Sequence, residues 1–323
     1  MEIVKASIND LQKMNDLWNE VVSEEGFYKP FTYSEYQEKM LSNPEFSFDK
    51  VLLAKENNEL IGFTIIVTRE RNIDNGYITA LVVKKEYRHQ KVATRLIEKA
   101  EELLKKMGKK KVIVSNFLPS CYPWYIPNTD KHDHPCAPGI RINSNEYFFY
   151  LQSGYKTLNY CDAFHLALSN YELSPKIKET LEKNKEENLT IEVYDETKHY
   201  GIEEFYQKLN IYDFEKPIRD NLSLEKPYPF LVISENGKIK GWTGAMWNEE
   251  SGRGHFDGIA ILEEVRGRGL GKALFASLAY YSKMNGAKFM TFYTGLTNHA
   301  RYIYMGAGFK IIQSFCSFEK ELK

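Results

Sequence analysis

The stretch Arg266-Gly267-Arg268-Gly269-Leu270-Gly271 decides how the C-terminal half of this chain is interpreted. An apolar run at 256–262 precedes it, and a helix-like segment at 272–285 follows it. A turn rich in glycine and arginine between a strand and a helix directs backbone N–H groups and a helix N-terminus to one point, which suits an anion. Glycine allows close approach of the backbone, and arginine adds charge-assisted hydrogen bonds. The stretch therefore predicts a pyrophosphate site, although its spacing is neither the dinucleotide fingerprint nor the P-loop.

A second motif lies downstream of this turn. A predicted strand at 289–293 leads to Asn298, and Tyr304 and the pair Gly308-Phe309 follow at fixed distances. Together the two motifs resemble those of the GNAT superfamily of acyl-CoA-dependent N-acyltransferases. The family's turn, Arg/Gln-x-x-Gly-x-Gly/Ala, matches this turn at its first, fourth and sixth positions. The resemblance implies an α/β (α+β) fold, with a mixed, mostly antiparallel central sheet flanked by helices.

The resemblance also implies roles for individual residues. Tyr304 matches the tyrosine that protonates the departing thiolate. In the family, a bulge in the strand before the turn frees a backbone N–H for the thioester carbonyl, and here that position falls near Ile261. The predicted contacts of acetyl-CoA in this half are Ile261, Arg266, Gly267, Arg268, Gly269, Leu270, Gly271 and Asn298.

Several side chains are candidates for the base that removes a proton from the acceptor amine. Side chains alternate along a strand, so His255 and Asp257 share the face that leads to Ile261. Histidine titrates near neutrality, whereas an aspartate needs burial to raise its pKa. Glu249 and Glu250, in the preceding hairpin, are further candidates, and the sequence leaves the choice open.

An internal repeat indicates two domains. A strand at 77–83, a turn at 87–93 and an amphipathic helix at 94–107 occur in the first half in the same order. Tyr150 precedes Gly154-Tyr155 by four residues, as Tyr304 precedes its own Gly-Phe pair. A chain of 323 residues is long for one domain. We predict tandem GNAT-like domains at 1–169 and 170–323.

The first half departs from the family pattern. Lys91 stands where the turn has its first glycine, and a lysine is expected to fit only if its φ is negative. Tyr77 and Thr79 replace the candidate base residues, and Ser144 replaces the asparagine. We therefore predict a degenerate N-terminal domain that is possibly non-catalytic. Its predicted acyl-CoA contacts are Val83, Arg88, Gln90 and Ala93.

A long insertion at 117–143 has no counterpart in the second half. It is rich in proline and aromatic residues, which favours an ordered loop over the first cofactor cleft or against the second domain. Four of its side chains could bind zinc, but their spacing matches no finger or ribbon, so no metal is predicted. These residues are Cys121, His132, His134 and Cys136.

Composition restricts the partners and the compartment. The net charge of −1 gives no reason to expect nucleic acid or an anionic membrane as a partner. No apolar run approaches the roughly 20 residues of a membrane span. Four cysteines in a chain of this size are not expected to form a disulfide framework. We predict a cytoplasmic monomer or homodimer.

These observations favour an acyl-CoA-dependent N-acetyltransferase. The C-terminal domain would transfer acetyl from acetyl-CoA to the primary amine of a small molecule by direct attack. Two alternatives remain open at this point. One is acetylation of a protein or peptide amine, and the other is a non-catalytic acyl-CoA-binding or sensing protein.

Overall fold

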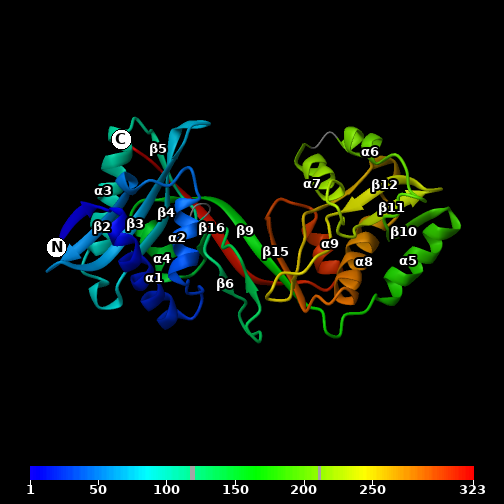
Figure 1. Cartoon of the computed structure of the whole chain (residues 1–323), viewed down its shortest axis with the longest axis horizontal. Coiled ribbons are helices and arrows are strands. Elements are labelled where there is room, and N and C mark those ends of the chain that lie inside the picture. Colours follow the sequence, from blue (N-terminus) through cyan, green and yellow to red (C-terminus); the bar gives the residue numbers. More distant parts are fainter. Residues whose placement is uncertain (117–120, 210–211) are drawn as a thin grey trace. The chain divides into compact units, whose positions relative to one another are not determined.

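The computed structural model describes residues 1–116, 121–209 and 212–323, except for the side chains of 212–214 (Figure 1). The chain forms two compact units. Unit 1 comprises Met1–Ala163 together with Ile312–Lys323, and unit 2 comprises Phe164–Ile311. The predicted mixed sheet flanked by helices is confirmed, and the boundary near residue 170 stays a prediction. None of the described helices is both long and apolar enough to cross a membrane.

Unit 1 is built on a sheet with the strand order β1-β2-β3-β4-β5-β16-β9, and β8 pairs with β16. Its strands are β1 (Glu2–Lys5), β2 (Val51–Glu56), β3 (Glu59–Arg69), β4 (Asn72–Val83), β5 (Lys111–Val114), β6 (Trp124–Tyr125), β7 (Asp133–His134), β8 (Ile140–Arg141), β9 (Lys156–Ala167) and β16 (Lys310–Glu321). Its helices are α1 (Leu11–Glu25), α2 (Tyr33–Leu41), α3 (Val92–Lys106) and α4 (Asn145–Gln152), with short 3-10 turns at Ile8–Asp10, Phe48–Lys50 and Lys85–Tyr87.

Two apolar clusters hold unit 1 together. α1 and α2 contribute Leu11, Met14 and Tyr36 to one cluster, which packs on strands β2 and β3. α3 contributes to the second cluster with the apolar stripe expected from its sequence, because Leu96 and Leu104 are completely buried there. The chain's last strand, β16, belongs to this second cluster and lies among the strands of the N-terminal part (Figure 1). Unit 1 therefore needs both ends of the chain.

The pairing of β4 with β5 is short and decides where the site lies. These parallel strands are in register only from Asn75↔Lys111 to Ile78↔Val114. β5 ends there, while β4 continues to Val83 in antiparallel register with β3. A bulge interrupts the β3–β4 ladder opposite Thr79, between Ile65 and Ile66. One edge of the distal part of β4 is thus open to a ligand.

Unit 2 contains the four-stranded sheet β10-β11-β12-β14 and the parallel pair β13–β15. Its strands are β10 (Leu189–Val193), β11 (Leu231–Glu235), β12 (Lys238–Thr243), β13 (Arg253–Gly254), β14 (Ile259–Ile261) and β15 (Phe289–Gly295). Its helices are α5 (Pro175–Glu186), α6 (Ile202–Leu209), α7 (Tyr212–Leu222), α8 (Leu270–Met284) and α9 (Arg301–Gly306), with a 3-10 turn at Glu263–Val265.

Local sequence signals explain several elements of unit 2. An Asn-Gly pair favours a tight hairpin, and Asn236 and Gly237 both have the positive φ that such a turn requires. Ser174 caps α5 by accepting a hydrogen bond from the N–H of Ile177, as the Ser-Pro start predicts. The charge-rich sequence of α5 is typical of a solvated helix, but Ile177 and Asn184 are buried and the helix packs on α8 and β10. A sparse apolar face was enough for this packing.

The insertion contains a disulfide that the sequence did not predict. Cys121 and Cys136 are bonded, with Cα atoms 4.6 Å apart, while Cys161 and Cys316 are free. The hairpin of β6 and β7 brings the two ends together, because Trp124 pairs with His134 and the N–H of Ala137 donates to the carbonyl of Tyr122. One bond is not a disulfide framework, but no pattern in the sequence predicts this pair. Metal ligation requires free thiolates, so the zinc alternative fails.

Phe318 tests the dependence of unit 1 on the C-terminal strand. It pairs with Val114 on β5 and is completely buried. We expect Phe318→Ala to lower the free energy of unfolding of unit 1 by about 3–5 kcal/mol. Phe148→Ala, which removes a ring that is 49% exposed on α4, should cost less than about 1 kcal/mol. Hydrogen exchange in α3 and β5 is the measurement, and unchanged protection there in the Phe318 variant would contradict this fold.

The disulfide makes a second prediction. It closes a loop with a sequence separation of 15, so reduction should cost unit 1 about 3 kcal/mol. Chemical denaturation with and without dithiothreitol measures this loss. Cys121→Ser should show the lower stability without responding to the reductant, whereas Cys161→Ser should respond like wild type. Titration of the denatured, unreduced chain should give two thiols, and four thiols would refute the bond.

Candidate functional site

A cavity of about 530 Å³ lies in unit 1, where β4 extends beyond β5. This volume is in the range of small-molecule sites. Its walls come from α1, the end of β4, the turn that leads into α3, and the start of α4. Three of the predicted N-terminal contacts line it, namely Val83, Arg88 and Ala93. The fourth, Gln90, does not line it, and its side-chain amide donates to the carbonyl of Glu86 (2.7 Å).

The turn beside this cavity has the same backbone form as the glycine-rich turn of unit 2. Lys91, the N-cap of α3, has φ +62°, and Gly269, the N-cap of α8, has φ +78°. His89 (φ +61°) likewise corresponds to Gly267 (φ +80°). The expectation that Lys91 requires a negative φ is wrong. Left-handed backbone costs a non-glycine residue about 1–2 kcal/mol, so the surrounding structure must hold this turn in place.

Five charged side chains line the cavity, namely Glu25, Arg88, Lys91, Arg141 and Glu146. Arg88 donates to Glu25 at the end of α1 (2.8 Å) and to the carbonyl of Val83 (3.2 Å). The guanidinium of Arg141 lies over the ring of Phe27, 4.4 Å from its centre. Glu146 forms no hydrogen bond or ion pair with any residue that the structure describes. Burial, and then the charge of Glu25, raise the pKa of Glu146 to about 8, although Arg141 and Arg88 oppose this shift.

Neutral polar groups also line the cavity, whereas the completely buried Tyr150 is not among its lining residues. The amide of Asn116 donates to the hydroxyl of Tyr28 and to the carbonyl of Gly139, both at 3.2 Å. Ser144, which replaces the family's asparagine, caps α4 and also lines the cavity. The hydroxyl of Tyr150 is buried and has no hydrogen-bond partner within the described ranges. Burial, followed by the charge of Glu146, raises the pKa of Tyr150 well above its usual value.

The predicted pyrophosphate turn of unit 2 contacts helix α5. A methyl group on Gly269 would lie 3.1 Å from the Cγ2 of Thr180. The amide of Asn184 donates to the carbonyl of Arg268 (3.3 Å), and the guanidinium of Arg268 forms an ion pair with Glu187. The sequence does not predict this helix at the turn.

The remaining residues of this turn lie beside the unit 2 core. Leu270 is buried, and Gly271 faces Ile261 and Ile303. Arg266 follows a 3-10 turn at the C-cap position, in extended backbone. The stretch therefore has the predicted strand–turn–helix form.

Tyr304 lies in an aromatic cluster. Its ring centre is 4.6 Å from Phe292, 4.7 Å from Phe275, 5.6 Å from Phe164 and 6.2 Å from Phe256. Burial raises its pKa to about 12, which suits a group that keeps its proton until it is needed.

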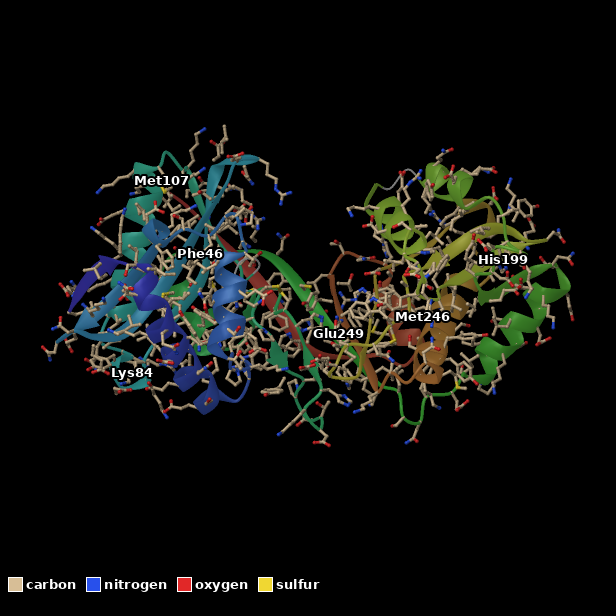
Figure 2. All side chains as sticks on the ribbon, viewed as in Figure 1. Phe46, Lys84, Met107, His199, Met246 and Glu249 are labelled. Carbon is tan, nitrogen blue, oxygen red and sulfur yellow. A yellow bond between two sulfur atoms is a disulfide. The ribbon has the colours of Figure 1, made fainter. Side chains whose placement is uncertain are left out.

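The candidate bases of unit 2 form a separate group. His255 Nε2 and Asp257 Oδ1 are hydrogen-bonded, and the imidazole stacks on Trp247 with ring centres 4.2 Å apart. Neither residue shares a hydrogen bond or ring contact with Tyr304 in the part of the chain that the structure describes. Glu249, labelled in Figure 2, forms an ion pair with the buried Arg253.

The backbone geometry of unit 2 bears on two further predictions, the bulge near Ile261 and the role of Asn298. The β12–β14 ladder keeps its register through Gly241↔Ile261, so the bulge expected near Ile261 is absent there. The interruption instead lies at 255–258, between β13 and β14, where the strand must leave β15. The side chain of Asn298 accepts a hydrogen bond from the N–H of Ala300 (2.9 Å), next to α9.

The sequence analysis missed Glu25, Arg141 and Glu146. An acidic residue in the first turn of a helix, as Glu146 is, is usually explained by the helix dipole. Glu25 and Arg141 are far from the turn in sequence. Among the described residues, no group of three or more His, Cys, Asp or Glu side chains is placed to hold a metal ion.

The family follows from comparison with known proteins. The model of the acetyltransferase (GNAT) family matches residues 13–121 and 190–309, which is more than half of the chain. The chain therefore belongs to the GNAT acetyltransferase family, and it carries two such regions. No curated protein matches it.

Solved structures share the fold at low identity. One is the GCN5-related glucosamine N-acetyltransferase region of a fungal multi-domain β-N-acetylglucosaminidase, with a TM-score of 0.67, 16% identity and coverage of 99% of this chain but 38% of that one. A GCN5-related N-acetyltransferase from Sphaerobacter thermophilus has a TM-score of 0.62 and 14% identity, with coverage of 100% of this chain and 96% of that one. A tandem GNAT protein from the clavulanic acid biosynthesis pathway has a TM-score of 0.58 and 12% identity, with coverage of 100% of this chain and 98% of that one.

The left-handed lysine gives a direct test of the turn. Lys91→Gly should raise the free energy of unfolding of unit 1 by about 1 kcal/mol, because glycine adopts this φ without strain. Gln90→Gly, at the neighbouring position without positive φ, should lower it by about 0.5–1 kcal/mol. Equilibrium denaturation of the two variants measures both changes. Equal destabilisation by both glycines would contradict the left-handed assignment.

Proposed function

We propose that this protein is an acyl-CoA-dependent N-acetyltransferase that transfers acetyl from acetyl-CoA to the primary amine of a small molecule by direct attack. The cavity of unit 1 carries this proposal, because it opens beside the turn at 88–93, which lies in the first GNAT region and has the same backbone form as the glycine-rich turn of unit 2. A cavity of about 530 Å³ is of a size that suits a small acceptor.

The residues around this cavity fit an acyl-CoA. Its pantetheine arm would lie along the open edge of β4 near Val83, where β5 has ended. The turn at 88–93 would hold the pyrophosphate with backbone N–H groups at the start of α3, with Arg88 and Lys91 adding positive charge. When bound, acetyl-CoA supplies the thioester. The buried hydroxyl of Tyr150 would protonate the thiolate.

For the C-terminal domain, the sequence-based proposal is that transfer takes place there. The two left-handed glycines of its turn and the raised pKa of Tyr304 support it. Tyr304 would be the acid, and His255 or Asp257 would be the base. The contacts of α5 with this turn favour unit 1 instead, because Thr180 and Asn184 lie where a ligand would approach.

The acceptor and the setting of the reaction are further parts of the proposal. The fungal structure with the same fold is described as a glucosamine N-acetyltransferase region, which makes an amino sugar the first acceptor to test. A cytoplasmic location, a monomeric or homodimeric state, and the absence of metal, nucleic acid and membrane partners stay predictions.

Calorimetric titration with acetyl-CoA tests the proposal. We expect saturable binding that Ala93→Phe abolishes at unit 1, since the larger side chain enters the cavity. Gly269→Val is the matched variant in unit 2. Loss of a site only in this variant would assign acyl-CoA to the C-terminal domain. Two sites in wild type would mean that both turns bind. A folded wild-type chain that binds no acetyl-CoA would refute the proposed function.

A further inference from the structure

We infer that Glu146 is the catalytic base of this acetyltransferase, and that it binds the acceptor's ammonium group in the cavity of unit 1. This inference rests on the proposed function and deepens it. It assigns transfer to the N-terminal domain, which the sequence analysis treats as possibly non-catalytic. Neither the family match nor the related structures name this residue.

The position of Glu146 is the first argument. It lies in the first turn of α4, one helical turn before Tyr150, and its side chain lines the cavity. Side chains four positions apart lie on the same face of a helix, so the carboxylate and the tyrosine face the same region. The electrostatic effect of Glu146 on Tyr150 agrees with this closeness. Acid and base would thus come from one rigid element.

The missing partner of Glu146 is the second argument. The other carboxylate that lines the cavity, Glu25, is paired with Arg88. Glu146 has no such partner among the residues that the structure describes, although Arg88 and Arg141 are near enough to affect it. A half-buried carboxylate without a partner is costly, and an ammonium group that enters the cavity would supply the missing charge.

The surroundings of Glu146 also tune it for proton transfer. The titratable and charged groups that act on it, or on which it acts, come from five different segments. They are Glu25, Tyr28, Arg88, Arg141, Tyr150 and Cys316. Burial and the charge of Glu25 raise the pKa of Glu146 to about 8 against the opposing charges of Arg141 and Arg88, while Tyr28, Tyr150 and Cys316 are groups that its own charge affects. A base is most effective when its pKa is close to the working pH, whereas an ordinary glutamate is too weak to take a proton from an ammonium group.

The proposed step balances without any further reactant. One proton moves from the acceptor's ammonium nitrogen to an Oε atom of Glu146. The freed nitrogen attacks the acetyl carbon, so that a C–N bond forms as the C–S bond breaks. Tyr150 donates its proton to the thiolate, which becomes a thiol. The new amide nitrogen then loses its extra proton, and this proton restores the hydroxyl of Tyr150. Glu146 then releases its proton to solvent.

The experiment compares the full-length wild type with Glu146→Gln, which mimics the protonated carboxyl. Glu98→Gln, an exposed position on α3, is the matched control. The first measurement is the affinity for acetyl-CoA between pH 6 and pH 9. Below about pH 7 the two proteins should bind equally. As the pH rises through about 8, Glu146 ionises and repels the anionic ligand, so wild type should bind about tenfold more weakly than the glutamine variant.

The second measurement is CoA release with glucosamine and a panel of small primary amines. Wild type should become faster as the pH rises toward 8, and Glu146→Gln should be slower by about 10²-fold or more, with acetyl-CoA binding intact. Glu98→Gln should match wild type in both measurements.

Each contrary result has one meaning. Equal pH dependence of binding in wild type and Glu146→Gln would refute the placement of Glu146 in the cofactor cavity. Unchanged transfer in Glu146→Gln, or binding without transfer in wild type, would refute its catalytic role. If wild type binds no acetyl-CoA, the proposed function itself fails, so the two failures are distinct.

Discussion

The site of this protein depends on one feature of strand pairing. β4 and β5 are held together over four residue pairs and then separate, because β5 ends at Val114 while β4 continues to Val83. Backbone groups along the free edge of β4 then require a partner, and a ligand can supply it. The left-handed turn at 88–93 and α4 lie around the same opening. The cavity therefore lies where these strands diverge, with the turn and α4 in its walls.

The sheet that supports this opening is completed by the far end of the chain. β16 lies between β5 and β9 in the strand order, and its Phe318 is buried in the cluster that also contains Leu96 and Leu104 of α3. The helix that presents the turn at its N-terminus is therefore packed against residues more than 200 positions away. The N-terminal site therefore depends on the C-terminal strand β16.

The two units show how similar backbones can have different surroundings. Both turns have two left-handed residues before a helix, although one uses His89 and Lys91 and the other uses glycines. In unit 1 the turn lines a cavity, whereas in unit 2 Thr180 and Asn184 of α5 contact it. The glycine motif alone thus favoured the turn of unit 2 as the acyl-CoA site. Glycine content indicates how freely the backbone can bend, but it does not indicate which segments pack against the turn.

The sequence by itself determined the family and the fold, because the strand–turn–helix order, the repeated spacing of Tyr150 and Tyr304, and the periodicity of α3 are all local patterns. It also predicted the Asn236-Gly237 hairpin, which depends on two adjacent residues. Only the tertiary structure decided that Cys121 bonds to Cys136, that α5 contacts the second turn, and that Glu146 lines a cavity without an ion-pair partner among the described residues. Each of these depends on distant segments that meet only after folding, and no short-range pattern records such a meeting.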